Sequence, residues 1–329
     1  QKFNEKFNIL IYFYYLLENI IIDTDTAGDD VTSIMLAALS PINLISITIA
    51  AGNVPVELGA KNALLTLEKV NKKNVPVFMG SRKPMLRDLV TAQYVHGNDG
   101  MGNSNFPDPQ KQPENGNASA ELVNYAEMYK KNLIICAQAP LTNIALATLM
   151  DNNFPKNVKH LYIMGGTYRH AGNITPAAEY NFFVDPEAAY IVLKSGFNAT
   201  ILPWDLCAEH GTITIDEIMH NYEKNKTDLF KFYLDVNRSA IEYNKSGKSG
   251  ININGLTHSD SLLMSCILNN DIIMETKNVR VDISIEDEIT RGFSSMIPDD
   301  NSKIKVITRI NEDKFKKFLF GSLQNGIKD

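Results

Sequence analysis

The sequence predicts an α/β protein with a single domain built on a mostly parallel, doubly wound sheet. Short apolar runs alternate along the chain with segments in which apolar residues recur at helical spacing. No internal repeat or low-complexity linker divides this alternation, and 329 residues with 44% hydrophobic residues suit one large domain. Polar residues also follow directly after several apolar runs, where ligands bind in such sheets.

The elements can be taken in chain order. The first strand is the apolar run 20–22, and a helix follows it because Val31, Ile34, Met35 and Ala38 recur at helical spacing. Two stretches rich in Gly and Asn, 91–118 and 237–258, are expected to be irregular loops and candidate walls of a substrate pocket. The further strands are expected at 44–50, 75–78, 133–137, 158–164 and 199–202, and the further helices at 58–67, 140–149, 186–193 and 261–268.

The turn after the first strand carries four carboxylates within eight residues: Asp23, Asp25, Asp29 and Asp30. Helix capping explains one or two of them, but not Asp23 and Asp25, which stand at the strand end. Carboxylates packed together repel one another, so they need a cation, shared protons or strong donors. A hard divalent cation with oxygen ligands is the simplest of these answers.

Further polar residues follow other predicted strands. Asn53 ends the second strand, Gln138 follows the strand at 133–137, and the segments 173–181 and 257–260 lie at the ends of later apolar runs. Because the carboxyl ends of parallel strands meet at one edge of a sheet, these groups are expected to face one pocket. Amide and carboxylate groups pair well with hydroxyls, which suits a polyhydroxylated ligand.

Several motifs together resemble the inosine-uridine-preferring nucleoside hydrolase family over nearly the whole chain, from about residue 20 to residue 318. They are DTDTAGDD at 23–30, AGN at 51–53, HGNDGMG at 96–102, PLTN at 140–143, MGG at 164–166, GNITPAAEYN at 172–181 and VDPEAA at 184–189. The resemblance implies the Rossmann-like nucleoside hydrolase fold and a tightly bound Ca²⁺. It also implies hydrolysis of the N-glycosidic bond of ribonucleosides to ribose and free base, a reaction of nucleoside catabolism and salvage.

The resemblance also implies roles for individual residues, carried over motif by motif. Asp25, Asp30 and Asp260 are implied calcium ligands through their carboxylates, and Gln138 through its main-chain carbonyl. Asp25 is further implied as the base that activates a calcium-bound water, with Asp23 supporting the loop from behind. The residues implied to hold ribose hydroxyls are Asp29, Asn53, Asn173, Glu179 and Asn181, and those implied to border the pocket are Met164 and His96.

One position departs from the family pattern. Many members have a histidine directly before the last calcium aspartate, as proton donor to the leaving base. Here Ser259 stands at that position and His258 lies one residue earlier. His258 is therefore a candidate leaving-group acid, and an ordinary loop histidine is the alternative interpretation.

Two other functions are weighed against this one. The run 20–26 also resembles the first motif of haloacid-dehalogenase-like phosphohydrolases, in which Asp23 is the nucleophile, Asp25 the acid/base and magnesium the metal. That family needs a further Gly-Asp or Asp-Asp pair with magnesium-ligand spacing after a later strand, and the strand end at 164–166 has none. A non-catalytic, calcium-dependent sugar-binding protein would keep the metal ligands and lose the base, yet Asp25 is present.

Charge and cysteine content narrow the possible partners. A net charge of −6 argues against nucleic acid as a partner. Three cysteines (Cys136, Cys207 and Cys266) form no CxxC pattern, and Cys136 and Cys266 are expected to be core residues. The resemblance implies a small-molecule ribonucleoside substrate and a homo-oligomer, either a dimer or a tetramer.

The N-terminus differs from the rest of the chain. Residues 1–19 are interpreted as an extension before a domain at 20–329, and Lys2 and Lys6 followed by the apolar run 8–17 resemble a signal segment. This run is too short to span a bilayer. Cytoplasmic location is expected, and six Asn-X-Ser/Thr triplets keep a secreted location open.

Overall fold

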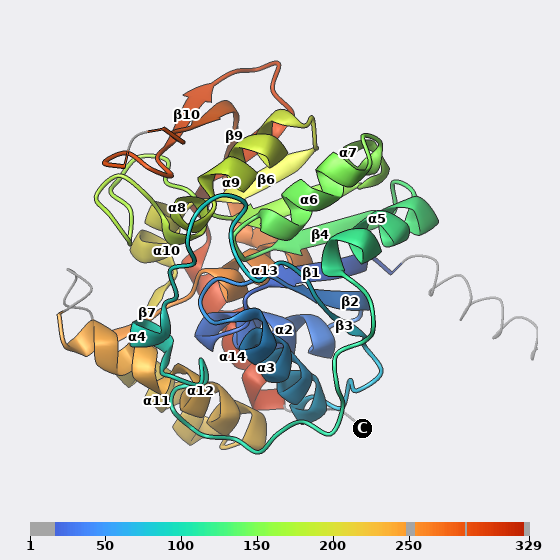
Figure 1. The fold of residues 1–329 in the computed structure, drawn as a ribbon. Coiled ribbons are helices and arrows are strands. Elements are labelled where there is room, and N and C mark those ends of the chain that lie inside the picture. The colour runs from blue at the N-terminus through green and yellow to red at the C-terminus, as the bar shows by residue number, and fades with distance from the viewer. Residues whose placement is uncertain (1–16, 248–253, 287, 326–329) are drawn as a thin grey trace, which may run out of the picture.

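A computed structural model describes residues 17–247, 254–286 and 288–325 of the chain (Figure 1). Within these residues, nine strands form one sheet in the order β10-β9-β11-β6-β5-β4-β1-β2-β3. The strands are β1 (Asn19–Thr24), β2 (Asn43–Ile49), β3 (Val77–Met79), β4 (Leu133–Ala137), β5 (His160–Met164), β6 (Ala199–Leu202), β9 (Ile273–Ile283), β10 (Ser294–Pro298) and β11 (Ile304–Ile310). A separate antiparallel pair joins β7 (Thr212–Thr214) to β8 (Gly255–Thr257).

The central part of the sheet is parallel, as predicted. Strands β3, β2, β1, β4, β5, β6 and β11 pair in parallel, whereas β9 pairs antiparallel with β11 and β10 antiparallel with β9. The fold class predicted from the sequence is therefore confirmed, although the antiparallel edge was not predicted. The strand order reverses between β1 and β4, and in open α/β sheets ligands bind at this switch point.

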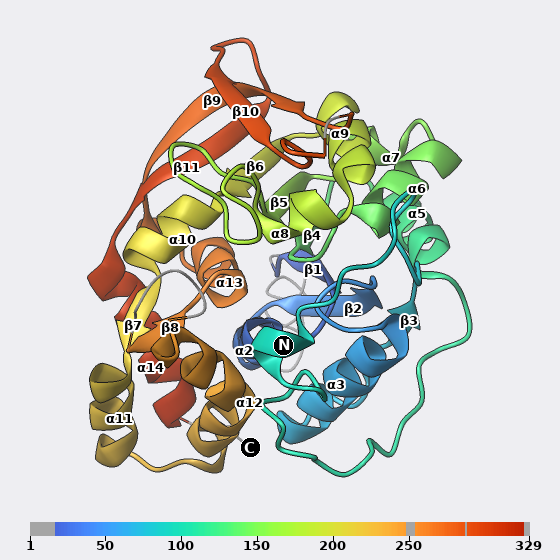
Figure 2. The ribbon, with the colours of Figure 1, turned by 60° about the vertical axis from the view of Figure 1, so that its left-hand side comes forward.

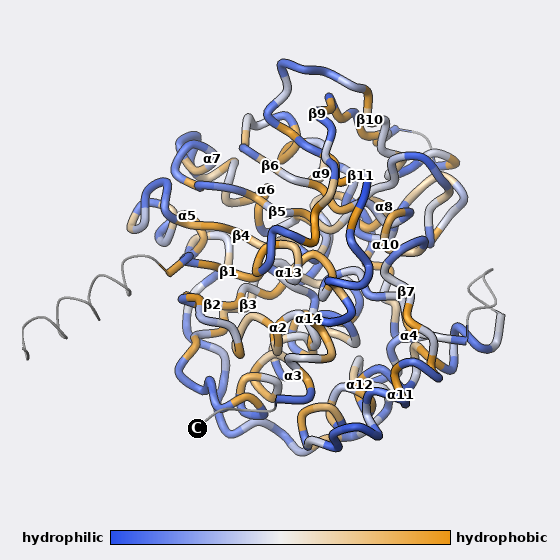
Figure 3. Tube along the Cα trace, turned by 180° about the vertical axis from the view of Figure 1, so that it is seen from behind, coloured by the Kyte–Doolittle hydropathy of each residue, from blue (hydrophilic) through white to orange (hydrophobic). Residues whose placement is uncertain are grey.

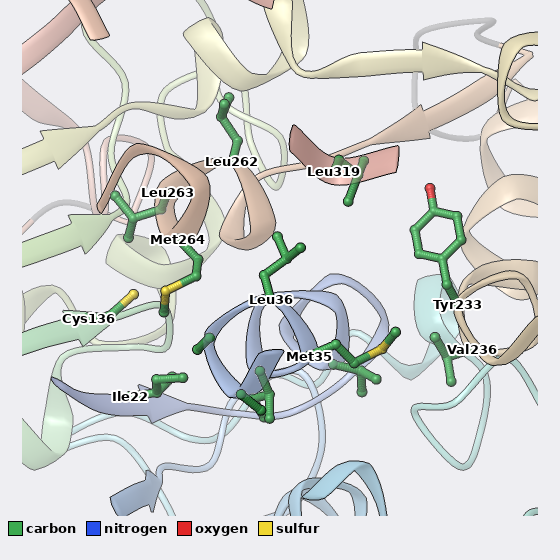
Figure 4. Close-up of a cluster of buried hydrophobic side chains, with 14 of the residues drawn as sticks. Ile22, Met35, Leu36, Cys136, Tyr233, Val236, Leu262, Leu263, Met264 and Leu319 are labelled. Atoms are coloured by element: carbon green, nitrogen blue, oxygen red, sulfur yellow. The ribbon is translucent and has the colours of Figure 1, made fainter. Parts of the chain in front are cut away.

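Helices cover both faces of the sheet, because the side chains of each strand alternate between two apolar layers. In β1, Ile20 and Ile22 face the first of these layers, whereas Ile21 faces the second. The central strands are hydrophobic and the peripheral loops mainly hydrophilic (Figure 3). In the first layer, Leu36 lies near Leu262 and Leu319 (Figure 4).

Some of the helices were predicted from the sequence, and others were not. The helices of the first layer are α2 (Gly28–Leu39), α3 (Val56–Lys69), α12 (Asp228–Lys245), α13 (Asp260–Leu268) and α14 (Glu312–Asn325). Those of the second layer are α5 (Ala118–Tyr129), α6 (Thr142–Met150) and α9 (Pro186–Lys194). Between these lie the short helices α4 (Gln93–His96), α7 (Phe154–Asn157), α8 (Tyr180–Val184), α10 (Trp204–His210) and α11 (Ile215–Lys224), and the 3₁₀ turn η1 (Asn270–Ile272). The helices predicted from the sequence are present as α2, α3, α6, α9 and α13, whereas α5, α12 and α14 were not predicted.

One predicted loop is wrong over part of its length. The stretch 237–258 was expected to be irregular, but α12 continues through Lys245, and β8 occupies 255–257. Phe232, Val236 and Ala240 are buried at four-residue spacing, so an apolar face extends across the predicted boundary. The other predicted loop, 91–118, is irregular except for α4 and the first residue of α5.

The N-terminal extension lies almost entirely outside the described residues, so the signal-like interpretation stays a prediction. Strand β1 already begins at Asn19, whose side-chain amide donates to the carbonyl of Asn132 at 3.1 Å. In the ranges that the structure describes, no helix is both long enough and apolar enough to cross a membrane.

Candidate active site

A cavity of about 800 Å³ opens above the carboxyl ends of β1 and β4, at the switch point of the sheet. Figure 2 shows α2, α8, α13 and α4 arranged around this end of β1. The cavity wall includes nine of the predicted site residues: Asp29, Asn53, His96, Gln138, Met164, Asn173, Glu179, Asn181 and Asp260. The predicted clustering of polar strand-end residues is thus present in the structure.

Asp25 and Asp30 are fully buried beside this cavity, at the end of β1 and the start of α2. The amide nitrogen of the Asn53 side chain donates to Asp25 Oδ1 and to Asp30 Oδ2, both at 3.2 Å. The Asn53 backbone N–H donates to Asp25 Oδ2 at 2.5 Å. Gly52 allows this close approach, since a Cβ atom there would lie 2.0 Å from Asp25 Oδ2.

The buried carboxylates destabilise one another's charged forms. Burial raises the pKa of Asp25 well above its usual value, and the neighbouring Asp30 charge raises it further. Burial likewise raises the pKa of Asp30 to about 6, against hydrogen bonds from Thr24, Ala27 and Gln138. The pKa of Asp260 is also raised by burial and then by the charges of Asp30, Asp29 and Asp25, so these four carboxylates form one electrostatic cluster.

Gln138 joins the end of β4 to this cluster. Its side-chain nitrogen donates to Asp30 Oδ1 at 3.1 Å, and its side-chain oxygen accepts from Ser33 Oγ at 2.7 Å. Its main-chain carbonyl accepts from the Asn181 amide at 3.4 Å. The side chain is therefore turned toward α2, and the carbonyl faces the segment after β5.

Asp23 lies at the end of β1, on the face of the sheet that is covered by α6 and not on the face that is covered by α2. Its Oδ1 accepts from Thr48 Oγ1 at 2.6 Å and from the Asn143 amide at 2.9 Å, while its Oδ2 has no partner among the described residues. Burial raises its pKa to about 7. These contacts tie β1 to β2 and to the start of α6, as expected of a residue that supports the turn from behind.

Asp29 joins the start of α2 to the start of α13. Its Oδ2 accepts from the backbone N–H groups of Ser259, Asp260 and Ser261 at 2.8, 2.8 and 3.0 Å, and its Oδ1 accepts from Ser261 Oγ at 2.6 Å. An aspartate from one helix thus supplies the N-terminal cap of another. The same residue lines the cavity, so its predicted contact with ribose would be made by a carboxylate that already holds Asp260 in place.

The segment after β5 forms another part of the wall. Glu179 caps α8, accepting from the backbone N–H of Asn181 at 2.9 Å and of Phe182 at 3.2 Å, and also from Gly166 N–H at 2.9 Å. Burial raises the pKa of Glu179 to about 7 against these three bonds. Asn181 donates to the Met164 carbonyl at 3.1 Å, and Asn173 accepts from Tyr180 N–H at 2.8 Å.

The two candidate histidines have different surroundings. His258 is fully buried outside the cavity wall, with Nε2 at 2.8 Å from the Tyr233 hydroxyl and Nδ1 at 3.2 Å from the Gly211 carbonyl. Both ring nitrogens are therefore engaged in the core, and the structure does not bring this side chain to the pocket. His96 does line the cavity, and burial lowers its pKa to about 4 although the Asp29 charge opposes this shift.

Some wall residues lie outside the stretches that the sequence analysis named, and others lie inside the two stretches 91–118 and 237–258 that were expected to form pocket walls. Trp204 directly follows β6 and Pro203, so the strand-end rule could have identified it. Tyr94 on α4 and Tyr243 on α12 lie within the two expected wall stretches, although no motif marked these residues themselves, and their ring centroids are 5.6 Å apart in an edge-to-face arrangement. Asn237 and the exposed His170 also line the cavity.

In the described ranges 17–247, 254–286 and 288–325, no group of three or more His, Cys, Asp or Glu side chains is placed to hold a metal ion. The carboxylates at the turn are instead bonded to amide, hydroxyl and backbone donors, as given above. The metal ligands implied by the motifs thus stay predictions.

Comparison of the sequence with known proteins shows which family the chain belongs to. The sequence model of the inosine-uridine preferring nucleoside hydrolase family matches residues 20–317 of this chain. The chain is 30% identical over 312 residues to the inosine-uridine preferring nucleoside hydrolase of Leishmania major, covering 93% of this chain and 97% of that protein. It is 32% identical over 276 residues to a pyrimidine-specific ribonucleoside hydrolase of a Shewanella strain, covering 84% and 85%.

Solved structures agree with this match. A plant nucleoside hydrolase superposes with a TM-score of 0.85 at 26% identity, covering 93% of this chain and 99% of that chain. The match favours neither the phosphohydrolase nor the sugar-binding alternative, because it extends over nearly all of the chain with hydrolases of nucleosides. The chain belongs to the inosine-uridine preferring nucleoside hydrolase family and is an enzyme that acts on the N-glycosyl bonds of nucleosides.

Proposed function

We propose that this enzyme hydrolyses ribonucleosides to ribose and free base with Ca²⁺ bound at the turn after β1, and that Asp25 is its general base. The observation that carries this proposal is the cluster of Asp25, Asp30 and Asp260, three buried carboxylates at the switch point of the sheet. Two relatives, an inosine-uridine preferring nucleoside hydrolase and a pyrimidine-specific ribonucleoside hydrolase, support a ribonucleoside substrate.

The chemistry of the donor groups fits a hard divalent cation. None of the salt bridges in the described part of the chain involves Asp25, Asp30 or Asp260, so no basic side chain neutralises them. Their pKa values are raised because burial and mutual repulsion disfavour the charged forms. A cation would relieve both, and Ca²⁺ takes carboxylate and carbonyl oxygens of the kind that Asp25, Asp30, Asp260 and Gln138 supply.

The residues divide the reaction between them. When bound, Ca²⁺ supplies positive charge that makes a nearby water more acidic. Asp25 takes a proton from the attacking water as its oxygen bonds to C1′ of the ribose. The C1′–N bond breaks ahead of this bond formation, and its electron pair leaves on the base nitrogen.

The transition state carries positive charge on the ribose ring, because glycosidic cleavage passes through an oxocarbenium-like state. Asp29, Asn53, Asn173, Glu179 and Asn181 are proposed to hold the ribose hydroxyls from fixed positions. Asn53 is held by its hydrogen bonds to Asp25 and Asp30, and the other four by hydrogen bonds to the backbone, before substrate arrives. Little reorganisation therefore accompanies the reaction. His258 has no role in this scheme, and His96 is the proposed proton donor to the leaving base.

A panel of purine and pyrimidine nucleosides, assayed by release of reducing sugar with and without a calcium chelator, tests the proposal. We expect activity on ribonucleosides that falls on chelation and returns when Ca²⁺ is added back. Metal analysis of the purified chain should give about one calcium per chain, the number that one such site holds. Full activity in the chelated protein, with no bound metal, would show that the calcium assignment is wrong.

The oligomeric state stays a proposal as well. The family resemblance implies a dimer or tetramer, and light scattering of the purified chain measures it directly. No residue in the scheme above comes from a second chain, so a monomer would leave the proposed chemistry unchanged.

A further inference from the structure

The antiparallel edge of the sheet packs against the part of the cavity wall that carries Glu179 and Asn181. Glu179 caps α8, and Asn181 lies in the first turn of this helix of five residues. A helix this short is not stable by itself, so its position depends on contacts with other segments. The turn that joins β9 to β10 supplies such contacts through Arg291 and Gly292.

Arg291 holds the C-terminal end of α8. Its Nη2 donates to the Val184 carbonyl at 3.1 Å, and its guanidinium carbon lies 4.3 Å from the centre of the Phe183 ring. The last carbonyls of a helix lack partners within the helix, and an arginine side chain can satisfy one of them. Arg291 is only 9% exposed, so water competes little with these contacts.

Gly292 brings the turn into direct contact with the backbone of α8. A Cβ atom at this position would lie 2.6 Å from Phe183 Cα and 2.7 Å from the Phe182 carbonyl oxygen, and φ is +75°. Glycine fits such a close approach in this conformation without strain. The turn and α8 are thus packed backbone to backbone, so a displacement of one displaces the other.

The same edge also makes a contact on the other side of the Glu179 carboxylate. Ser294 Oγ donates to the Thr167 carbonyl and accepts from the Thr167 N–H, both at 2.9 Å. The preceding residue, Gly166, donates its N–H to Glu179 Oε2 at 2.9 Å. The antiparallel edge therefore holds both backbone segments to which the Glu179 carboxylate is bonded.

We propose that Arg291 is a positioning residue for ribose recognition: it fixes the C-terminal end of α8 and thereby keeps Glu179 and Asn181 where they meet the ribose hydroxyls. Arg291 is not among the described residues that line the cavity, so it acts through α8. This inference rests on the proposed function, because it takes Glu179 and Asn181 as ribose-binding residues. It gives a role in the reaction to the antiparallel edge, which lies outside the sequence motifs quoted above.

The test compares a ribonucleoside with its deoxy analogues. A displaced Glu179 or Asn181 bonds a hydroxyl less well, which costs the ribonucleoside more than an analogue that lacks this hydroxyl. In Arg291→Gln, kcat/KM on a ribonucleoside should fall about 10- to 100-fold, the effect that a small displacement of a positioned group can have. The preference over at least one of the 2′-, 3′- and 5′-deoxynucleosides should shrink about 10-fold, a part of the roughly 10⁴-fold discrimination that paired polar groups can give. A role in stability alone would lower the rates on all four substrates equally.

Three further measurements sharpen the test. Arg280→Gln removes an exposed arginine of the same edge, which donates to Asp282 on its own strand, and should keep the parent rate and discrimination. Ser294→Ala removes only the hydroxyl that holds Thr167, so it should shrink the same discrimination by less. Methylguanidinium added to Arg291→Ala should restore part of the lost discrimination, because it refills the space over the Phe183 ring.

The outcomes separate this inference from the proposed function. An unchanged discrimination against every deoxynucleoside in folded Arg291→Gln overturns the inference, whatever happens to the melting temperature or the overall rate. If Arg291→Gln does not fold, an unchanged discrimination in Ser294→Ala overturns it instead. A parent protein that hydrolyses ribonucleosides and all three deoxy analogues equally well removes the ribose roles of Glu179 and Asn181, and the inference with them. A parent protein with no nucleosidase activity overturns the proposed function as well.

Discussion

Two parts of the cavity wall are built in different ways. The part formed by strand ends has its carboxylates bonded before any substrate is present: Asp29 accepts four hydrogen bonds and Glu179 three. The part formed by α4 and α12 presents the edge-to-face pair of Tyr94 and Tyr243 and two polar atoms without a described partner. These atoms are His96 Nδ1 and Asn237 Oδ1. The first part is rigid and polar, and the second is aromatic and incompletely paired.

This difference matches two demands of the proposed reaction. Every ribonucleoside has the same ribose, so the groups that hold it can be fixed by the backbone. The nucleobases differ in shape but all have flat faces, so aromatic rings can accept several of them. Substitutions and substrate changes at the strand-end part should therefore have larger effects than those at the helical part.

The largest expected effect concerns the ribose hydroxyls. If the strand-end residues form hydrogen bonds to these hydroxyls, 2′-deoxynucleosides should be poorer substrates by roughly 10⁴-fold in kcat/KM. The missing 2′-hydroxyl would leave buried polar groups of the wall without a hydrogen-bond partner. Comparing inosine with 2′-deoxyinosine under one set of conditions measures this ratio. Similar kcat/KM values for the two nucleosides would show that the strand-end part of the wall does not bind the ribose hydroxyls.

Asp25→Asn should cause the next largest effect. The substitution keeps the shape of the side chain but removes the proposed base and one negative charge, so turnover should fall well over ~100-fold. Circular dichroism and a thermal melt show whether the variant folds. Asp228→Asn, at the start of α12 and outside the main cavity wall, is the matched control and should keep parent-level activity.

The histidines test the helical part of the wall. His96→Ala should lower turnover on nucleosides at least ~10-fold, the low edge of the range for a general acid. It should lose little on p-nitrophenyl riboside, whose leaving group departs without protonation. Parent-level rates on both substrates would show that His96 is not the acid.

His258→Ala is expected to behave differently, because this ring bonds to Tyr233 and Gly211 in the core. We expect a loss of stability of about 1–3 kcal/mol from the unpaired groups, measured by urea unfolding, with turnover nearly unchanged. A large loss of turnover in a stable His258→Ala protein would contradict the placement of His258 away from the chemistry.

The smallest expected effect is a dependence of stability on pH at Glu179. Burial raises its pKa from the usual 4.5 to about 7 in the folded chain, so the folded state binds the proton more tightly. Its contribution to stability is complete below the unfolded pKa and is lost as the pH rises through about 7. The free energy of unfolding of chelated protein should fall about 1 kcal/mol between about pH 6 and about pH 7 from this group, and less in Glu179→Gln.

The strand ends could be predicted from the sequence because parallel strands bring their carboxyl ends to one edge. Asp25, Asn53 and Gln138 follow from this rule, and the structure places them together. The capping of α13 by Asp29 could not be predicted, since it joins residues 29 and 261 and leaves no local pattern. Asn237 was assigned to a loop because nearby Asn, Lys and Gly residues outweighed the apolar face of α12.

The hydrogen bonds of Asp29 have a consequence for the order of assembly. The carboxylate and its partners at Ser259–Ser261 are separated by about 230 residues, and Asp260, the third carboxylate of the cluster, lies among those partners. A nascent or truncated chain that lacks α13 therefore has only part of the acidic cluster, and Asp29 has lost its partners. The complete metal site would then exist only in chains that have folded through α13. Free metal would bind these chains and stabilise them selectively over partly folded ones.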